Sequence, residues 1–141
     1  MSSICVPHCV DQAERQQWNY VFNNWSIDTI YLLCDVNFDD DTWSSHALLR
    51  LKTVQLIKSI SEISEPLVLI TSKTSSIIKG EIDLSTYIHP NNCCYMFGNN
   101  DNTEFKETIV GDKVYIETLN ELYNWSSACI VFYDRMVKSG N

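Results

Sequence analysis

The stretch CCYMFGNN, residues 93–100, joins a run of apolar residues to a glycine and two asparagines. An apolar run without polar interruption is typical of a strand covered on both faces, and such strands belong to parallel sheets. Gly98 follows this run, and its missing side chain would let another chain segment or a ligand approach the backbone closely. The stretch therefore predicts an inner strand over 93–97 with a candidate site at its carboxyl end.

The flanking segments alternate between strand and helix patterns. Three more apolar runs predict strands at 29–34, 66–71 and 113–118. Helical spacing of apolar residues predicts helices at 10–25, 46–60 and 122–138. This alternation predicts an α/β fold with a mostly parallel sheet and helices on both faces. The 141 residues, 45% of them hydrophobic, are enough for one domain over 1–141 with its own core.

Composition and motifs exclude several classes of protein. The formal net charge is −8, so a nucleic-acid-binding protein would need a local basic patch on an acidic background. The start MSSICVPHCVDQ has neither the basic nor the apolar part of a secretory signal, which predicts a cytoplasmic protein with reduced thiols. No dinucleotide fingerprint, P-loop or Gly-x-Ser-x-Gly elbow is present, so those enzyme classes have no support.

A cluster of thiols and a histidine near the amino end is the first metal candidate. Cys5, His8 and Cys9 would need Cys93 and Cys94 to complete a zinc site. Adjacent cysteines rarely ligate one ion well, and the usual Cys-x-x-Cys pairing is missing. We therefore predict buried or idle thiols and no metal site.

Two further polar features have simple structural interpretations. His89 precedes Pro90, a setting typical of a turn residue with a hydrogen-bonded ring rather than of a catalytic base. The acidic run Asp39–Asp41 is typical of a solvated loop rather than of a cation site.

Two longer segments carry a resemblance to a known family. The segment HPNNCCYMFGNNDN (89–102) resembles the part of the SPOUT-class, SpoU-like RNA 2′-O-ribose methyltransferases in which an apolar strand is followed by Phe-Gly-x-Glu. The segment DKVYIETLNELYNWSSACIVFYDR (112–135) is similar to their closing strand, loop and alanine-rich helix. A weaker similarity to their first motif is found in LLCD and SSHALLR, where Ala47 and Arg50 match and Ser44 replaces an asparagine.

The resemblance implies a fold and an activity. The family fold is a parallel α/β domain with a deep carboxyl-terminal trefoil knot, here expected over about 93–138. Its loops hold S-adenosylmethionine, whose methyl group is transferred to a ribose 2′-hydroxyl. The implied cofactor-binding residues, acting largely through their backbone, are Phe97, Gly98, Asn99, Asn100, Tyr115, Ile116, Glu117, Thr118, Leu122, Tyr123 and Asn124.

A catalytic residue and an assembly follow from the same resemblance. Arg50 takes the place of the family arginine that stabilises the developing alkoxide, and its alternative role is that of a solvent-facing residue on a helix. The family works as homodimers packed across the closing helix, so we expect a homodimer with RNA, from tRNA or rRNA, as its partner.

Departures from the family pattern leave two functions open. Asn100 replaces a glutamate, Glu117 replaces a proline, and either Tyr123 or Asn124 occupies the family asparagine position. The chain is therefore expected to be an RNA ribose methyltransferase or, alternatively, a catalytically silent SPOUT-like module that binds a protein or a small adenosyl ligand. The compact, asparagine-rich chain also leads us to expect a phage origin and action in the host cytoplasm.

Overall fold

The computed structural model describes residues 2–34, 43–44, 46, 49, 51–72, 80–98 and 103–140. Its strands are β1 (Ser2–Pro7), β2 (Thr29–Leu33), β3 (Thr53–Ile57), β4 (Leu67–Thr71), β5 (Ile82–Asp83), β6 (Cys93–Met96) and β7 (Asp112–Tyr115). They form one sheet in the order β3-β2-β1-β6-β4-β7-β5, and every pairing is parallel. The predicted α/β class with a mostly parallel sheet is confirmed.

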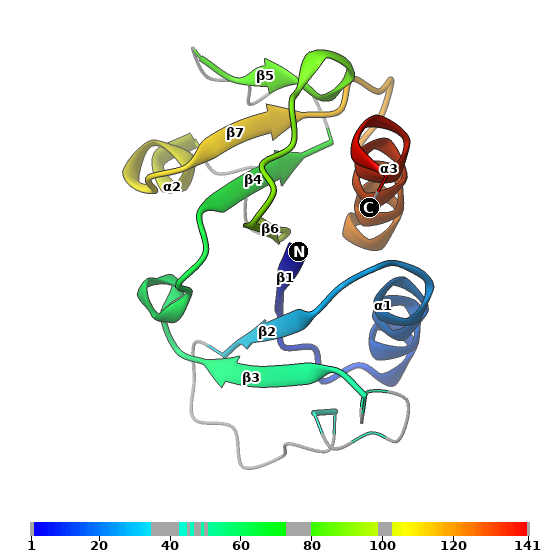
Figure 1. Ribbon diagram of the computed structural model, residues 1–141. Coiled ribbons are helices and arrows are strands. Elements are labelled where there is room, and N and C mark those ends of the chain that lie inside the picture. Colours follow the sequence, from blue (N-terminus) through cyan, green and yellow to red (C-terminus); the bar gives the residue numbers. More distant parts are fainter. Residues whose placement is uncertain are drawn as a thin grey trace.

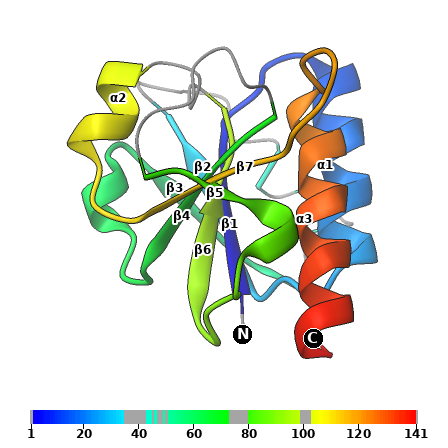
Figure 2. The ribbon, with the colours of Figure 1, turned by 90° about the horizontal axis from the view of Figure 1, so that it is seen from above.

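Helices cover both faces of this sheet. Helices α1 (Gln12–Asn24) and α3 (Asn124–Ser139) lie side by side on one face, whereas the short α2 (Thr103–Thr108) and a 3-10 turn at Ile60–Glu62 lie on the other (Figures 1 and 2). The side chains buried under α1 and α3 form the larger core cluster, and those under α2 form a smaller one. The strand β6 contributes to both clusters and is buried along its whole length, as an inner strand should be.

The two long helices follow the predicted spans 10–25 and 122–138 closely. Asp11 caps α1 by accepting hydrogen bonds from the backbone N–H groups of Ala13 and Glu14. Trp18 and Phe22, one turn apart, are buried on the inner face of that helix. Helix α3 ends at Gly140, whose left-handed backbone allows its N–H to bond to a carbonyl of the last turn.

The predicted helix at 46–60 is wrong, because residues 53–57 form the strand β3. The pairing of β3 with β2 is extended at both ends, where Thr53 N–H donates to Asp28 and Cys34 N–H donates to the carbonyl of Ile57. Val54 packs against the larger core cluster and Ile57 belongs to the smaller one, an alternation with period two. Pairing with the free edge of β2 thus favours a strand here more strongly than the helical spacing of the leucines favours a helix.

One inner strand of the sheet, β1, has no counterpart among the predicted elements. β1, with the sequence SSICVP, pairs with β2 on one side and β6 on the other, and its first five residues are buried. Its two serines and its cysteine interrupt the apolar pattern from which the other inner strands could be predicted. Cys5 is consequently a core residue, and burial raises the pKa of its thiol to about 12.

Candidate functional site

The carboxyl ends of β1 and β6 form the first part of the candidate site. The chain leaves β1 towards α1 on one face of the sheet and leaves β6 towards α2 on the other (Figure 2). Neighbouring parallel strands whose connections diverge in this way leave a crevice outside their carboxyl ends, where ligands of open α/β sheets bind. Gly98 lies at this point of divergence.

Gly98 is required by a close approach of the chain to itself. Its φ is +86°, a conformation that side chains other than glycine rarely adopt. A Cβ atom added there would lie 2.5 Å from Cγ and 2.8 Å from Cδ of Pro7, at the end of β1. The glycine after the apolar run therefore makes room for another chain segment, and that segment is the end of the strand that sequence analysis missed.

The ends of β4 and β7 form the second part of the site, and hydrogen bonds join them. The hydroxyl of Ser72, just after β4, accepts from the N–H of Leu122 at 3.1 Å and lies 3.4 Å from its carbonyl oxygen. The hydroxyl of Thr118 contacts the carbonyl of Ser72 and, at 2.7 Å, that of Asn120. The loop between β7 and α3 is thereby fixed against the neighbouring strand.

The start of α3 connects the two parts. The amide nitrogen of Asn124 lies 4.0 Å from the position of a Cβ on Gly98. Tyr123, the preceding residue, has its ring stacked on that of Trp125 with centroids 4.9 Å apart and an angle of 10°. Of the two candidates for the family asparagine position, Asn124 is therefore the one whose side chain faces Gly98.

The other predicted site residues differ in which of their groups lie at this edge of the sheet. The ring of Phe97 is buried against Trp18, so only its backbone faces the edge of the sheet. Tyr115 belongs to β7, and the N–H of Ile116 donates to the carbonyl of Thr71 at 2.8 Å, which extends the sheet. Glu117 is exposed. Arg50, Asn99 and Asn100 lie outside the described residues.

Two buried hydroxyls near this edge were not anticipated from the sequence. Among the residues that the structure describes, none forms a hydrogen bond with Oγ1 of Thr71, at the end of β4, or with Oγ of Ser127, in the first turn of α3. Leaving a buried hydroxyl unpaired costs about 1–3 kcal/mol. Both are therefore candidate contacts for a polar ligand. A single serine or threonine has no sequence pattern that would reveal it.

The opposite end of α3 is held by a buried polar network. Arg135 is 1% exposed and donates to the carbonyls of Pro90 and Asn91 and, at 2.9 Å, to the hydroxyl of Tyr95. These bonds fix α3 to the segment that leads into β6. Because α3 also provides Asn124, the network positions one wall of the candidate site from a distance.

His89 belongs to the same network as a neutral side chain. Its two ring nitrogens lie 2.6 Å from the hydroxyl of Tyr95 and 2.7 Å from a carboxylate oxygen of Asp134. Burial lowers the pKa of His89 and outweighs the attraction of Asp134. Since Arg135 donates to the Tyr95 oxygen, the Tyr95 hydroxyl donates to Nδ1 and Nε2–H donates to Asp134. The prediction of a hydrogen-bonded ring for His89 is confirmed, although no turn is assigned at residues 87–90.

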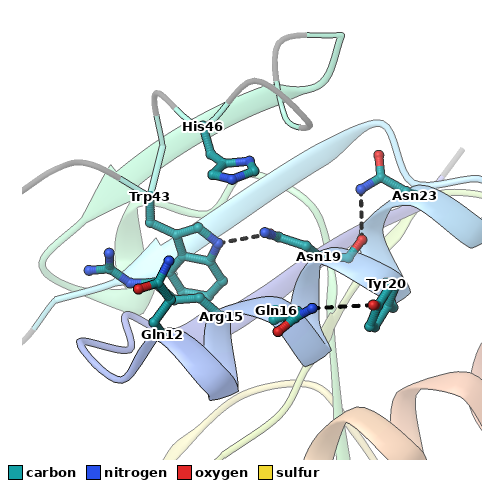
Figure 3. Close-up of a pocket in the computed structure, with 8 residues that line it drawn as sticks. All are labelled: Gln12, Arg15, Gln16, Asn19, Tyr20, Asn23, Trp43 and His46. Carbon is teal, nitrogen blue, oxygen red and sulfur yellow. Dashed lines mark hydrogen bonds between the residues drawn. The ribbon is translucent and has the colours of Figure 1, made fainter.

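A hollow of about 500 Å³ lies away from this edge, on the flank of α1 (Figure 3). One wall is a row of side chains from α1, and the opposite wall consists of Trp43 and His46. The indole N–H of Trp43 donates to the amide oxygen of Asn19 at 2.9 Å and holds the two walls together. This hollow was not predicted from the sequence.

Two further searches of the described residues give negative results. No group of three or more His, Cys, Asp or Glu side chains among them is arranged to hold a metal ion. Likewise, no helix in this part of the chain combines the length and apolarity that crossing a bilayer requires.

Comparisons with known proteins give structural matches alone. No family model matches the sequence, and no curated protein matches it either. The SpoU methyltransferase AviRb from Streptomyces viridochromogenes, solved in complex with the cofactor AdoMet, superposes with a TM-score of 0.66 at 12% identity over 95% of this chain. A proposed RNA methyltransferase from Bacillus anthracis superposes with a TM-score of 0.69 at 13% identity, covering 99% of this chain and 95% of its own.

This chain spans 58% of the length of AviRb, so that enzyme has a part with no counterpart here. At identities of 12% and 13% the superpositions establish the architecture of the chain, including the parallel sheet and its covering helices. The chain thus shares its α/β fold with the SpoU methyltransferase AviRb and with the protein from Bacillus anthracis.

Proposed function

We propose that this chain is a single-domain S-adenosylmethionine-dependent enzyme that methylates a ribose 2′-hydroxyl of RNA, in tRNA or rRNA. The cofactor of the structurally similar AviRb supports the first half of the proposal. The sequence resemblance to SpoU-like enzymes supports the second half.

The observation that carries the proposal is the convergence of three strand ends. Gly98 after β6, Ser72 after β4 and Thr118 after β7 follow neighbouring strands of the sheet. Asn124 and Leu122 then bring the last loop of the chain back over this edge. Backbone groups at such strand ends are well suited to an adenine edge, since no side chain has to be displaced.

The residues at this edge fit the cofactor in two respects. The positive φ of Gly98 turns the chain at the carboxyl end of β6, and the buried hydroxyls of Thr71 and Ser127 can donate to or accept from a polar ligand. The proposed cofactor-binding residues are Phe97, Gly98, Asn99, Asn100, Tyr115, Ile116, Glu117, Thr118, Leu122, Tyr123 and Asn124. When bound, S-adenosylmethionine supplies an electrophilic methyl group on a sulfonium.

Arg50 is the proposed catalytic residue. The chain has three arginines, and Arg135 is buried in the network that holds α3. Arg15 donates through Nε to the carbonyl of Cys9 and lies 5.8 Å from the ring of Trp43. A guanidinium at Arg50 would stabilise the alkoxide that develops when the 2′-hydroxyl loses its proton, a contribution made mainly in the transition state.

The trefoil knot over about 93–138 and the homodimer are further parts of the proposal. Helix α3 exposes four large apolar side chains, Ile130, Tyr133, Met136 and Val137, each at least 41% accessible. A second copy of the chain packed across α3 would cover them. Obligate interfaces of this kind bury more than about 2,000 Å² in total. A monomer mass by light scattering at micromolar concentration would contradict the dimer.

A catalytically silent module remains the second candidate, and one observation favours it. The loop between β7 and α3 satisfies several of its own polar groups, through the bonds of Ser72 to Leu122 and of Ile116 to Thr71. Fewer backbone groups are then left for a ligand than in an open loop.

Calorimetry with S-adenosylmethionine and S-adenosylhomocysteine tests the cofactor half of the proposal, and binding of both is expected. Methyl transfer to total tRNA and rRNA with labelled cofactor tests the second half. Arg50→Ala should leave S-adenosylhomocysteine affinity nearly unchanged and lower methyl transfer by roughly a hundredfold or more. Cofactor binding without transfer by the wild type would favour the silent module, and no binding at millimolar cofactor would reject the enzyme.

A further inference from the structure

Tyr123, at the start of α3, is the most exposed tyrosine of the chain. Its side chain is 70% accessible, compared with 57% for Tyr20 and Tyr133. Its ring lies nearly parallel to that of Trp125, with centroids 4.9 Å apart and an angle of 10°. One face of the Tyr123 ring is therefore covered by Trp125, and the accessible area belongs largely to the other face and the edge. Such a ring offers a flat apolar surface to a planar ligand.

The Tyr123 ring is held in place from inside the protein. Trp125 contacts the ring of Trp18 edge to face, with centroids 6.3 Å apart and an angle of 88°. Trp18 is 2% exposed and belongs to the larger core cluster. The carbonyl of Tyr123 also accepts from the N–H of Ser127 in the first turn of α3. Because the ring is already ordered, a ligand that stacks on it loses little binding free energy to ordering.

Helix α3 itself gains nothing from a tyrosine at this position. Tyr123 is the N-cap residue of α3, and its side chain makes no capping hydrogen bond. Ser, Thr, Asp and Asn are preferred at N-caps because their side-chain oxygen accepts from an N–H group of the first turn, as Asp11 does in α1. An exposed ring thus stands where a helix cap is usual, which indicates a role outside the stability of the fold.

Position and charge narrow the ligand. Asn124, the next residue, lies 4.0 Å from the position of a Cβ on Gly98, so the ring borders the edge where the cofactor is proposed to bind. The segment 116–134 has the carboxylates of Glu117, Glu121 and Asp134 and no lysine or arginine. A phosphate would find no cation on this segment, whereas an uncharged base with two apolar faces can stack on a tyrosine.

We propose that Tyr123 stacks on an unpaired base of the RNA, next to the ribose that is methylated. An unpaired base has a free face for the ring, whereas a base inside a duplex is covered on both faces by its neighbours. The substrate is then a loop, a bulge or a single strand rather than a regular helix. The inference rests on the proposed function, since it names the part of the RNA that the same enzyme would hold.

The test compares three single variants by their affinity for a labelled single-stranded oligoadenylate, measured by fluorescence anisotropy. Tyr123→Leu keeps an apolar side chain but removes the ring, and it should weaken binding roughly tenfold. Tyr123→Phe keeps the ring and should restore most of the lost affinity. Tyr20→Leu removes another exposed tyrosine, on α1, and should change the affinity by less than about twofold.

The salt dependence separates stacking from charge. Because stacking involves no ion pair, the ratio of wild-type to Tyr123→Leu affinity should be the same at about 50 mM and about 200 mM salt, although both affinities fall. A ratio that shrinks with salt would contradict a stacking role. Circular dichroism melts check that the variants fold.

Equal effects of Tyr123→Leu and Tyr20→Leu, or no binding of the oligoadenylate by the wild type, would overturn the proposal. Binding of the duplex with oligouridylate as tightly as of the single strand would also overturn it. So would a change in assembly mass with Tyr123→Leu at unchanged RNA affinity, since a second copy would then cover the ring.

Calorimetry with S-adenosylhomocysteine separates this inference from the proposed function. No binding of this ligand by the wild type, together with the expected order of oligoadenylate affinities, would reject the enzyme and keep the stacking site. Loss of S-adenosylhomocysteine affinity with Tyr123→Leu at unchanged RNA affinity would place the ring against the cofactor and overturn the inference.

Discussion

Replacing Gly98 by alanine should destabilise the protein through its contact with Pro7. A positive φ costs an alanine about 1–2 kcal/mol relative to glycine. The new Cβ would also lie 2.5 Å and 2.8 Å from two ring carbons of Pro7, which belongs to the inner strand β1, pairs with Leu33 of β2 and so cannot move freely. Overpacking of this kind costs about 1–3 kcal/mol. We therefore expect the free energy of unfolding in urea to fall by about 3 kcal/mol.

Gly80 offers the matched control for this prediction. Its φ is +94°, close to that of Gly98, but no atom of the described residues lies within 4 Å of an added Cβ. Gly80→Ala should therefore cost only the backbone part, about 1 kcal/mol. The double variant Gly98→Ala with Pro7→Ala should cost less than the sum of the two single variants, because the ring that clashes is gone. If Gly98→Ala costs no more than Gly80→Ala, the close approach of Pro7 is not what requires a glycine.

Three further predictions concern the buried polar groups. Lys106 and Glu81 form an ion pair of 2.8 Å, and both side chains are fully buried. Lys106→Met should therefore lower the free energy of unfolding in urea by about 3–5 kcal/mol, because it leaves a buried carboxylate unpaired, and adding Glu81→Gln should recover most of this loss. A small loss for the single variant would contradict this prediction. Arg135→Met should lower the free energy of unfolding by about 3 kcal/mol, because buried carbonyls lose their donors, and an unchanged melting temperature would argue against the network. Burial lowers the pKa of His89, so the folded state binds a proton less readily than the unfolded chain. The contribution of His89 to the free energy of unfolding is then fully present above about pH 6.5 and is lost as the pH falls below that value. His89→Gln should therefore flatten this part of the pH profile of stability measured in urea.

The elements that the sequence predicted correctly are those buried on both faces or along a wide helical stripe. The strand β6 is an uninterrupted apolar run, and α1 and α3 carry large apolar side chains at helical spacing. Such patterns survive in the fold because the core demands them. The edge strand β3 is different, since three of its five residues are exposed and only the pairing with β2 determines its conformation. That pairing is a tertiary effect, which a local pattern of leucines and isoleucines does not contain.

Half of the candidate site was predictable for a similar reason. A glycine directly after a buried strand signals a close approach, so Gly98 could be found from the sequence alone. The partner in that approach, Pro7, could not, because β1 has serines where an inner strand usually has apolar residues. Thr71 and Ser127 likewise become candidates only when the fold shows that their hydroxyls are buried without partners among the described residues.

Helix α3 ties the two parts of the candidate site together. Its first residue, Asn124, faces Gly98, and its later residue Arg135 fixes the segment that leads into β6. The distance between the end of β6 and the start of α3 is therefore set by buried bonds more than two helical turns away from the site. In the proposed function, backbone groups and short hydroxyls contact the cofactor, and such contacts place few demands on side-chain identity. Glu117, exposed on the loop after β7, lies at the surface of the candidate site, so replacing it should leave in place the bonds that hold the walls of the site.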